Sequence, residues 1–403
     1  MSTLKVDGIR SNSASSDAIT LASDGTCTAN ITNNLSNRNL VINGAMRVAQ
    51  RGTSSTAGSG YHTIDRYSFN VGGTDETPTV AQVDVSSGTT PYTLGFKKAL
   101  KITNGNQTGG AGAADYMEIY QYLEDQDISN SGWNFKSSSS YITVSFWIKS
   151  SVAQKFTGFF YTNQAGAGDS FMYSYQIDNG SGGNLSADTW TKITHSIPGN
   201  SSLSFNNDNT RGLAVGIYQF NGTNYTTSDK AFNAWSAWDS SAKTRDMTST
   251  WYTTNDATLE ITGLQLEVGP VATPFEHRSY GDELLRCYRY FVKYYGSTGG
   301  LSTGDGAIAT LANWTNSTAY GPIYLPVEMR AAPSPNNPPN YSNLVYYSAG
   351  NTFTPSGNQV AFVGAATNRV ELRINSMTNM SQGNAGWLRI ASTAGYIEFN
   401  AEL

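Results

Sequence analysis

The sequence predicts an all-β protein in which two β-sandwiches follow one another along the chain. Three observations predict this fold class. Charged residues make up only 14% of the 403 residues, and the polar character comes mainly from Ser, Thr, Asn and the 40 Gly. Aromatic and β-branched residues recur in short runs, and these residue types fit the pleated surface of a strand. Gly and Asn separate the runs, and both accept the positive φ angles that turns require.

The length and charge of the chain narrow its possible partners. A chain of 403 residues suggests two or three domains. The net charge of −5 provides no broad cationic surface, so we expect neither nucleic acid nor anionic lipid as a partner. No run approaches the roughly 20 apolar residues that span a bilayer, and the N-terminus lacks the layout of a secretory signal. The sequence therefore predicts synthesis in the cytoplasm and no membrane insertion.

Residues 1–38 are expected to form a short extended arm. Alternating strands are indicated near residues 4–6, 18–21 and 28–31, between Ser, Asn, Asp and Gly turns. The arm holds too little apolar surface to fold alone. It would therefore attach to a partner, either other copies of itself or another protein of the same assembly. The alternative is a disordered leader.

Residues 39–280 predict a central jelly-roll β-sandwich. Bulky residues cluster or alternate between Gly, Asn and Ser loops, at spacings that a two-sheet antiparallel sandwich produces. The predicted strands cover residues 80–85, 99–102, 116–122, 141–148, 156–161, 171–177, 190–194, 213–220 and 257–266.

Residues 281–295 are the best helix candidate and would form a helical connector. A strand after the helix is the alternative, because aromatic residues accumulate towards residue 295. Asp282 and Glu283 would lie in the first turn, where they interact favourably with the helix dipole. A single face would carry the apolar side chains, at the spacing of an amphipathic helix. These are Leu284, Cys287, Tyr288 and Phe291. Cys27 and Cys287 lie far apart in the sequence, so we expect two reduced thiols and no disulfide framework.

Residues 296–403 predict a second, smaller β-sandwich. Strands are indicated at residues 307–311, 320–327, 344–347, 359–363, 369–374 and 387–397. The Pro-rich passage at residues 331–339 cannot lie inside a central strand, because proline has no N–H to donate to a sheet. It is therefore expected to be an extended loop or an edge.

Four passages carry a resemblance to a known family. They are residues 39–52 with 61–67, residues 261–280, which contain the run Gly263 to Gly269, and residues 283–291. Together they resemble the β-sandwich module of bacteriophage tail fibres and receptor-binding proteins. Residues 141–148 resemble a central strand of carbohydrate-binding-module-like jelly rolls, and residues 325–333 and 398–403 resemble the fibre tip domain.

The resemblance implies a virion protein of a tail appendage, made in the host cytoplasm. It would be a homotrimer whose arm, residues 1–38, binds other phage tail or virion proteins. Its second sandwich would form the tip, and the fibre would adhere to a host surface glycan by multivalent, non-catalytic binding. Two alternatives stay open: a structural virion component, such as a head fibre, decoration protein or fibre adaptor, and a polysaccharide-cleaving fibre.

Catalytic and metal-binding signatures are sparse, which favours a protein that is not an enzyme. The chain has three His and lacks the HExxH, CxxC and GxSxG patterns. Carboxylates cluster at Glu118, Glu124, Asp125 and Asp127, and two acids that straddle a glycosidic bond would suit a glycosidase. No cofactor is expected. Residues 178–180 and 206–209 offer oxygen ligands for a structural calcium, but ordinary turns explain them better.

Exposed aromatic side chains are the candidates for sugar recognition, because flat rings pack against pyranose C–H groups. Trp235, Trp238 and Trp251 lie in the first sandwich, but the tip is favoured. Its candidate glycan-binding residues are Trp314, Asn313, Asn316, Tyr320, Tyr346, Tyr347 and Trp387. Trp314 is the preferred exposed residue. Tyr346 and Tyr347 would point to opposite faces of a strand, so at least one of them would be exposed.

Overall fold

A computed structural model describes residues 5–15, 17–21, 23, 27–29, 37–163, 170–296, 307–335, 344–355, 359–390 and 395–403. The prediction of an all-β fold is confirmed. Within these residues, strands dominate and the longest helix has only nine residues. No helix in the described part of the chain is long and apolar enough to cross a membrane.

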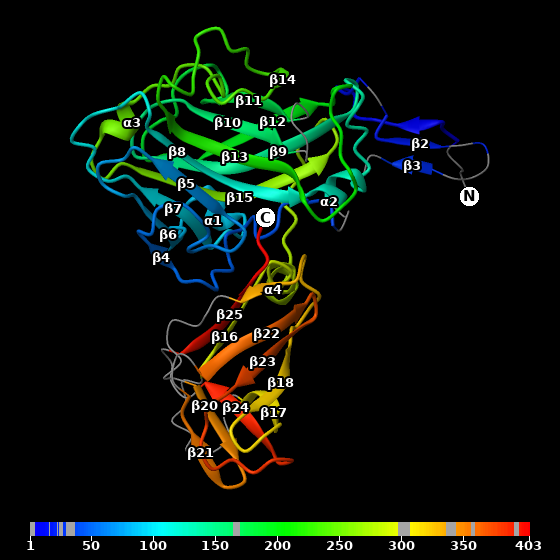
Figure 1. The fold of residues 1–403 in the computed structure, drawn as a ribbon. Helices are drawn as coiled ribbons and strands as arrows, with labels where there is room; N and C mark the ends of the chain where they lie inside the picture. The colour runs from blue at the N-terminus through cyan, green and yellow to red at the C-terminus, as the bar shows by residue number, and fades with distance from the viewer. Residues whose placement is uncertain are drawn as a thin grey trace.

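The N-terminal arm is a small antiparallel sheet that projects from the rest of the molecule (Figure 1). Its strands are β1 (Gly8–Ile9), β2 (Ile19–Leu21) and β3 (Cys27–Ala29). Strand β1 lies a few residues later than the strand that the sequence predicts near residues 4–6. Ile9 is 52% exposed and Leu21 is 39% exposed, so apolar side chains of the arm face solvent.

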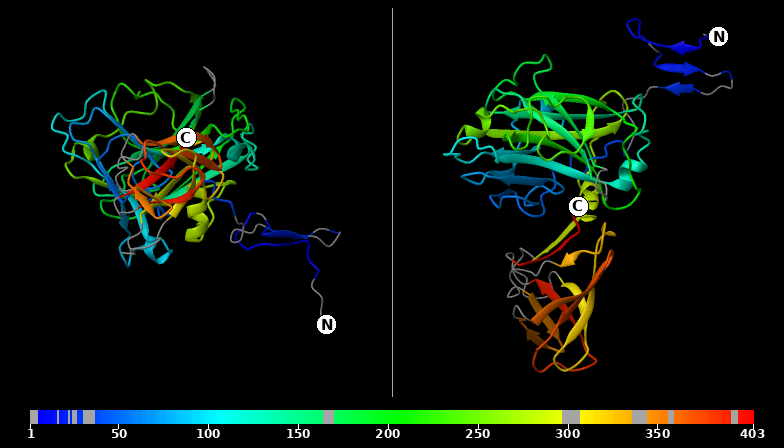
Figure 2. Two further views of the ribbon diagram at one scale, coloured as in Figure 1. Left: turned by 60° about the horizontal axis from the view of Figure 1, so that its bottom comes forward. Right: turned by 45° about the horizontal axis from the view of Figure 1, so that its top comes forward.

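The first sandwich consists of two antiparallel six-stranded sheets (Figures 1 and 2). The sheet that we call the β8 sheet has the order β14 (Trp235–Ala237), β11 (Phe171–Ile177), β10 (Phe156–Thr162), β13 (Arg211–Asn221), β8 (Tyr116–Glu124) and β5 (Ser68–Gly72). The β9 sheet has the order β12 (Thr191–Pro198), β9 (Tyr141–Ser150), β15 (Thr258–Val268), β7 (Lys98–Thr103), β6 (Thr79–Asp84) and β4 (Ser54–Ser55). The described loops carry three short helices, α1 (Thr90–Thr93), α2 (Asp125–Ser129) and α3 (Thr250–Thr253).

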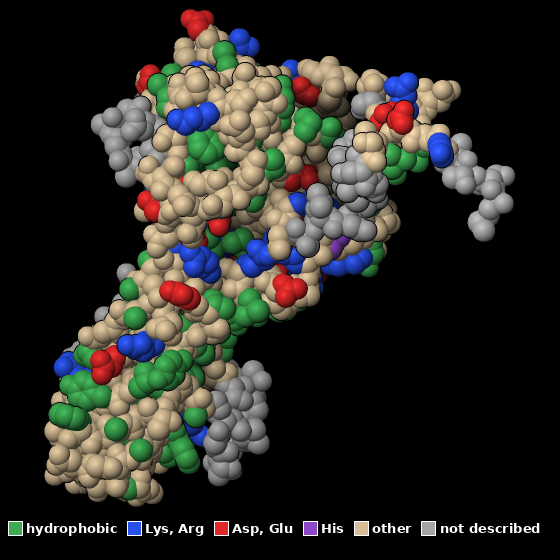
Figure 3. Space-filling view, turned by 90° about the vertical axis from the view of Figure 1, so that its right-hand side faces the viewer, with side chains coloured by type: hydrophobic (Ala, Val, Ile, Leu, Met, Phe, Trp, Pro, Cys, Tyr) green, Lys and Arg blue, Asp and Glu red, His purple; other side chains and the backbone are tan. Residues whose placement is uncertain are grey.

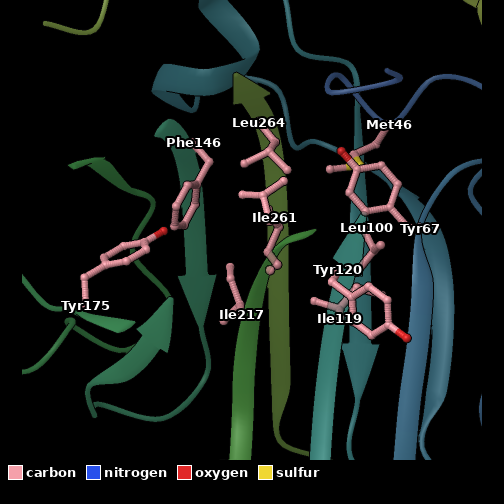
Figure 4. Close-up of a pocket in the computed structure, with 12 residues that line it drawn as sticks. Met46, Tyr67, Leu100, Ile119, Tyr120, Phe146, Tyr175, Ile217, Ile261 and Leu264 are labelled. Carbon is pink, nitrogen blue, oxygen red and sulfur yellow. The ribbon is translucent and has the colours of Figure 1, made fainter. Parts of the chain in front are cut away.

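Alternation along the strands decides which residues enter the core and which form the outer surface. In β8, Met117, Ile119 and Leu123 belong to the core between the sheets, so Tyr120 and Tyr122 point away from it. The packing leaves a gap of only about 20 Å³ with an almost wholly apolar lining (Figure 4). A gap of this size holds about one water molecule at most, so it is no ligand site.

The connector is shorter than the sequence predicted. Helix α4 (Tyr280–Tyr288) begins at a Ser279 cap, whose Oγ accepts a hydrogen bond from the Asp282 N–H at 3.1 Å. The chain then continues as strand β16 (Phe291–Tyr295), not as helix, because pairing with β25 outweighs local helix preference. Cys287 is a fully buried free thiol on the packed face of α4.

The second sandwich packs a seven-stranded sheet against a three-stranded sheet. The seven-stranded sheet has the order β21 (Asn351–Phe353), β20 (Leu344–Ser348), β24 (Ala385–Ile390), β17 (Ala307–Asn313), β18 (Ala319–Tyr324), β23 (Arg369–Ile374) and β22 (Val360–Ala366). The smaller sheet has the order β16, β25 (Tyr396–Asn400) and β19 (Ser334–Pro335). The described part of the Pro-rich passage thus contributes an edge strand, as expected, and residues 336–339 lie outside the described part.

The C-terminal residues return to the first sandwich, where the C label lies in Figure 1. The Glu402 carboxylate pairs with the guanidinium of Arg66, which is fully buried, and with that of Arg51 at 3.2 Å. Arg330 donates to the carbonyl oxygens of Ala401 at 2.8 Å and Glu402 at 3.0 Å. We call this set of contacts the joint. It fastens the second sandwich to the first at a point far along the chain from helix α4.

Candidate functional site

The outer face of the β8 sheet carries a groove of about 170 Å³. Strands β5, β8, β10, β11 and β13 form its floor, and the loop after β14 forms its rim. Its lining residues are Asn70, Glu118, Tyr120, Tyr122, Phe159, Tyr161, Met172, Ala214, Tyr218, Trp238 and Lys243. We call it the β8 groove.

Aromatic rings pack against one another along the β8 groove. Phe159 and Tyr218 are stacked, with ring centroids 4.2 Å apart, and both are buried in the floor. Tyr120 contacts Phe159 edge-on at 6.3 Å, and Tyr161 contacts Trp238 at 5.9 Å. Tyr120 and Tyr161 are half-buried and Trp238 is 42% exposed, so these three rings are accessible to a ligand.

Polar groups lie within the same groove. The Asn70 Nδ2 donates to Glu118 Oε1 at 2.8 Å. Burial raises the pKa of Glu118 above its ordinary value, while Lys243 and the Asn70 hydrogen bond act in the opposite direction. Burial also raises the pKa of Tyr120, so its phenol stays protonated and can donate a hydrogen bond. The groove therefore offers a carboxylate, an amide, an ammonium and phenols beside flat apolar surfaces.

Of the four carboxylates that cluster in the sequence, Glu118 lines the β8 groove and the other three lie near helix α2. Burial and the nearby Glu124 carboxylate raise the pKa of Asp127 to about 6. Among the described residues that line the β8 groove, Glu118 is the only carboxylate. Glu124 is held at the start of α2 by Arg289, at 2.6 and 2.7 Å, and by the Tyr290 hydroxyl at 2.6 Å. Asp125 accepts a hydrogen bond from the Asn207 N–H at 2.8 Å. These contacts provide no second acid opposite Glu118, as the two-acid mechanism of a glycosidase would require.

Two of the candidate glycan-binding residues in the tip, Tyr346 and Asn313, lie in the interior of the second sandwich. Tyr346 is fully buried and Asn313 is 3% exposed. The Tyr346 hydroxyl donates to Asn313 Oδ1 at 2.6 Å, and Asn313 Nδ2 donates to Ser348 Oγ at 3.0 Å. Their polar atoms are therefore engaged in hydrogen bonds within the fold and do not face solvent in this structure.

The other five candidates lie at the surface of the second sandwich. Trp387 and Tyr347 are cross-strand neighbours, on the face of the seven-stranded sheet opposite to Tyr346. Trp314 is 71% exposed in the turn after β17, and Asn316 is exposed in the same turn. Tyr320 is half-buried on β18. Hydrophobic side chains gather on the tip surface seen in Figure 3. These five residues remain a predicted glycan surface.

The loops proposed for calcium use their carboxylates to cap their own turns. Asp208 Oδ1 accepts from the Thr210 N–H at 2.8 Å, and Asp178 Oδ1 accepts from the Gly180 N–H at 2.7 Å. In the described residues, no three His, Cys, Asp or Glu side chains gather as a metal site would require.

Comparison with known proteins gives only distant matches. No protein-family model matches the chain, and no curated protein matches it. Among solved structures, the enzymatically active domain of tailspike protein 4 from bacteriophage CBA120 is 10% identical, with a TM-score of 0.30 over 58% of this chain. This chain spans only 22% of that tailspike chain.

Two further solved structures carry names that describe sugar-binding proteins. One is a putative sugar-binding protein from Bacteroides thetaiotaomicron, 12% identical with a TM-score of 0.29, over 57% of this chain and 100% of the other. The second is a family 11 carbohydrate-binding module from Clostridium thermocellum, 14% identical with a TM-score of 0.23, over 53% and 91%. Similarity at this level does not establish a shared function.

Proposed function

We propose that the protein binds glycan chains without cleaving them, through the β8 groove, and that it is an adhesion protein of a phage tail fibre. One observation carries the binding proposal: accessible rings and convergent polar side chains occur together on one face of a rigid sheet. Sugars present apolar C–H faces and hydroxyl edges, so recognition needs both kinds of group at once.

The size of the groove suits part of a chain. Its volume of about 170 Å³ is smaller than the roughly 300–1,000 Å³ of pockets that enclose a small ligand. A glycan would therefore lay one or two units against Tyr120, Tyr161 and Trp238 and continue into solvent. Glu118, Asn70 and Lys243 would bind its hydroxyl groups.

The tail-fibre proposal is supported by the resemblance of residues 261–280 to fibre modules. Weak contacts on each copy of a homotrimer would combine into strong adhesion. The exposed Ile9 and Leu21 of the arm offer apolar surface for attachment to other virion proteins. Trp314, Trp387 and the other exposed tip residues would provide a second contact with the host surface.

A glycan array with the full chain tests the binding proposal. We expect Trp238→Ala and Tyr161→Ala each to weaken glycan binding by about fivefold, since one lost aromatic contact costs on the order of 1 kcal/mol. Trp314→Ala and Trp387→Ala test the second contact proposed in the tip. Tyr324→Ala is the matched control, because it removes an exposed ring that belongs neither to the β8 groove nor to the predicted tip surface.

The outcomes separate the competing functions. Loss of binding only in the tip variants would move the site to the second sandwich. Absence of any bound glycan would favour a structural virion component. Shortened glycan products after incubation would show a cleaving fibre. Gold-labelled antibody against residues 296–403 checks the location, because label at the free ends of tail appendages is expected and label on the capsid would contradict it.

A further inference from the structure

The β9 sheet carries a second and larger groove, with a volume of about 520 Å³. It lies on the outer face of this sheet, so the whole sandwich separates it from the β8 groove. Trp147 and Lys192 form one side, because they are cross-strand neighbours on β9 and β12. Their neighbours Phe146 and Ile193 point into the core, which directs Trp147 and Lys192 outward. We call it the β9 groove.

The opposite side of the β9 groove is a cluster of three rings. Phe96, Phe275 and His277 have ring centroids 4.9 to 5.1 Å apart. The Phe96 ring lies against Gly263, where a Cβ atom would stand 2.7 Å from the ring. Gly263 also has a φ of +66°, at an irregularity in the pairing of β15 with β9. Glycine at this position therefore lets the aromatic wall approach the sheet.

The loop that carries Phe275 is held in place by hydrogen bonds. Glu267 is 2% exposed, and its carboxylate accepts from the Thr273 N–H at 2.8 Å and from the Thr273 hydroxyl at 2.6 Å. The backbone N–H of Glu276 donates to Gln265 Oε1 at 2.8 Å. The wall is thus fixed before a ligand arrives, which lowers the entropic cost of binding.

The described lining of the β9 groove carries positive charge and no negative charge. Its described lining residues include the Lys192 ammonium and no carboxylate. Lys192 is exposed and forms no ion pair with the described part of the chain. His277 adds no charge at neutral pH, because burial lowers its pKa. The β8 groove, by contrast, pairs a lysine with Glu118.

We propose that the β9 groove binds an acidic saccharide, with a uronate ring against Trp147 and its carboxylate on the Lys192 ammonium. Three observations point to this class of ligand. The volume lies within the range of ligand pockets, the ring wall suits pyranose C–H groups, and the unpaired cation suits a carboxylate. The inference adds a second site to the proposed function but does not depend on the β8 groove.

Titration calorimetry at low salt tests this proposal, with tetragalacturonate as the probe and cellotetraose as the neutral control. We expect Lys192→Gln to weaken tetragalacturonate binding about three- to fivefold at low salt, the size of an exposed ion pair. High salt should abolish this difference, because it screens the pair. Trp147→Leu should weaken tetragalacturonate binding about tenfold. Lys136→Gln is the matched control, because it removes an exposed lysine that lies outside the groove.

Each result decides the proposal. Absence of tetragalacturonate binding overturns it, as does binding that Lys192→Gln and Trp147→Leu both leave unchanged. Binding that only Trp238→Ala reduces would place the acidic glycan in the β8 groove, which overturns this inference while supporting the proposed function. Melting temperatures of both variants near that of the parent protein would show that a loss of binding is not a loss of folding.

Discussion

The two sandwiches use the same residue types in different ways. In the first sandwich, aromatic side chains of neighbouring strands contact one another and polar groups converge beside them, as in the stacked pair Phe159 and Tyr218. In the second sandwich, Trp314 and Trp387 are more exposed, but they lie in different parts of the surface, one in a turn and one on β24. The comparison teaches that convergence, more than exposure, distinguishes a candidate binding site.

The interiors of the two sandwiches also differ in the kind of polar group that they bury. The first sandwich buries charge at the joint, where Arg66 pairs with Glu402. The second sandwich buries a neutral pair, Asn313 and Tyr346. A buried charge that loses its partner is more costly than a buried neutral group that loses one. Substitutions in these two interiors should therefore lower the free energy of unfolding by different amounts.

The largest effect is expected at the joint. Glu402→Ala would leave the fully buried Arg66 without its carboxylate, and we expect this to lower the free energy of unfolding by about 3–5 kcal/mol. Differential scanning calorimetry measures the loss. Glu371→Ala is the control, because Glu371 is exposed on β23 and should change stability by less than about 0.5 kcal/mol. A loss below about 1 kcal/mol for Glu402→Ala would show that the joint is not essential.

The next effect concerns the pH dependence of stability near the joint. Burial raises the pKa of Asp65 from 3.8 to about 6, against the opposing effects of Arg51 and of hydrogen bonds from Gln50. Between these two pKa values the folded state binds more protons than the unfolded state, so stability should fall as pH rises through this window. We expect Asp65 to contribute about 1–3 kcal/mol to this fall.

Denaturant unfolding between pH 4 and pH 7 of the parent protein and of Asp65→Asn measures that contribution. The asparagine does not titrate, so the slope of stability against pH should change by the contribution of Asp65. Identical slopes in the two proteins would contradict the predicted shift. The comparison of slopes cancels the titration of other carboxyl groups.

The smallest expected loss of stability distinguishes a residue on the inner face of the seven-stranded tip sheet from its neighbour on the outer face. Tyr346→Phe removes a hydroxyl that donates to the buried Asn313, and we expect a loss of about 1 kcal/mol. Tyr347→Phe changes its half-exposed neighbour by the same single atom and should cost less than about 0.5 kcal/mol. Urea denaturation of both variants checks the difference. Equal losses would mean that the Asn313 contact does not stabilise the tip.

The sequence predicted the fold class because period-two patterns and turn residues are local signals. It also predicted that Tyr346 and Tyr347 point to opposite faces, and burial confirms this. It allowed a strand after the connector helix but did not locate the end of the helix at Tyr288, because the partner of β16 lies about 100 residues later in the chain. The domain boundaries at residues 38, 280 and 295 remain predictions.

The candidate site was harder to predict. The grooves require strands that are distant in sequence, as where Lys192 of β12 lies beside Trp147 of β9. One local signal for the β8 groove was present in the sequence. In β8 the outward positions hold Tyr120 and Tyr122, where a solvated strand face would ordinarily hold polar residues. Aromatic residues at the outward positions of a strand whose inward positions already hold the core residues Met117, Ile119 and Leu123 indicate a second contact surface.

The joint also has a mechanical consequence. The chain enters the second sandwich through β16 and leaves it through β25, and these strands pair side by side over five residues each. Both segments are tied to the first sandwich, one through α4 and the other through the contacts of Glu402. A pulling force applied at the far end of the tip would therefore be shared between two strands. Adhesion under load would then strain neither connection alone.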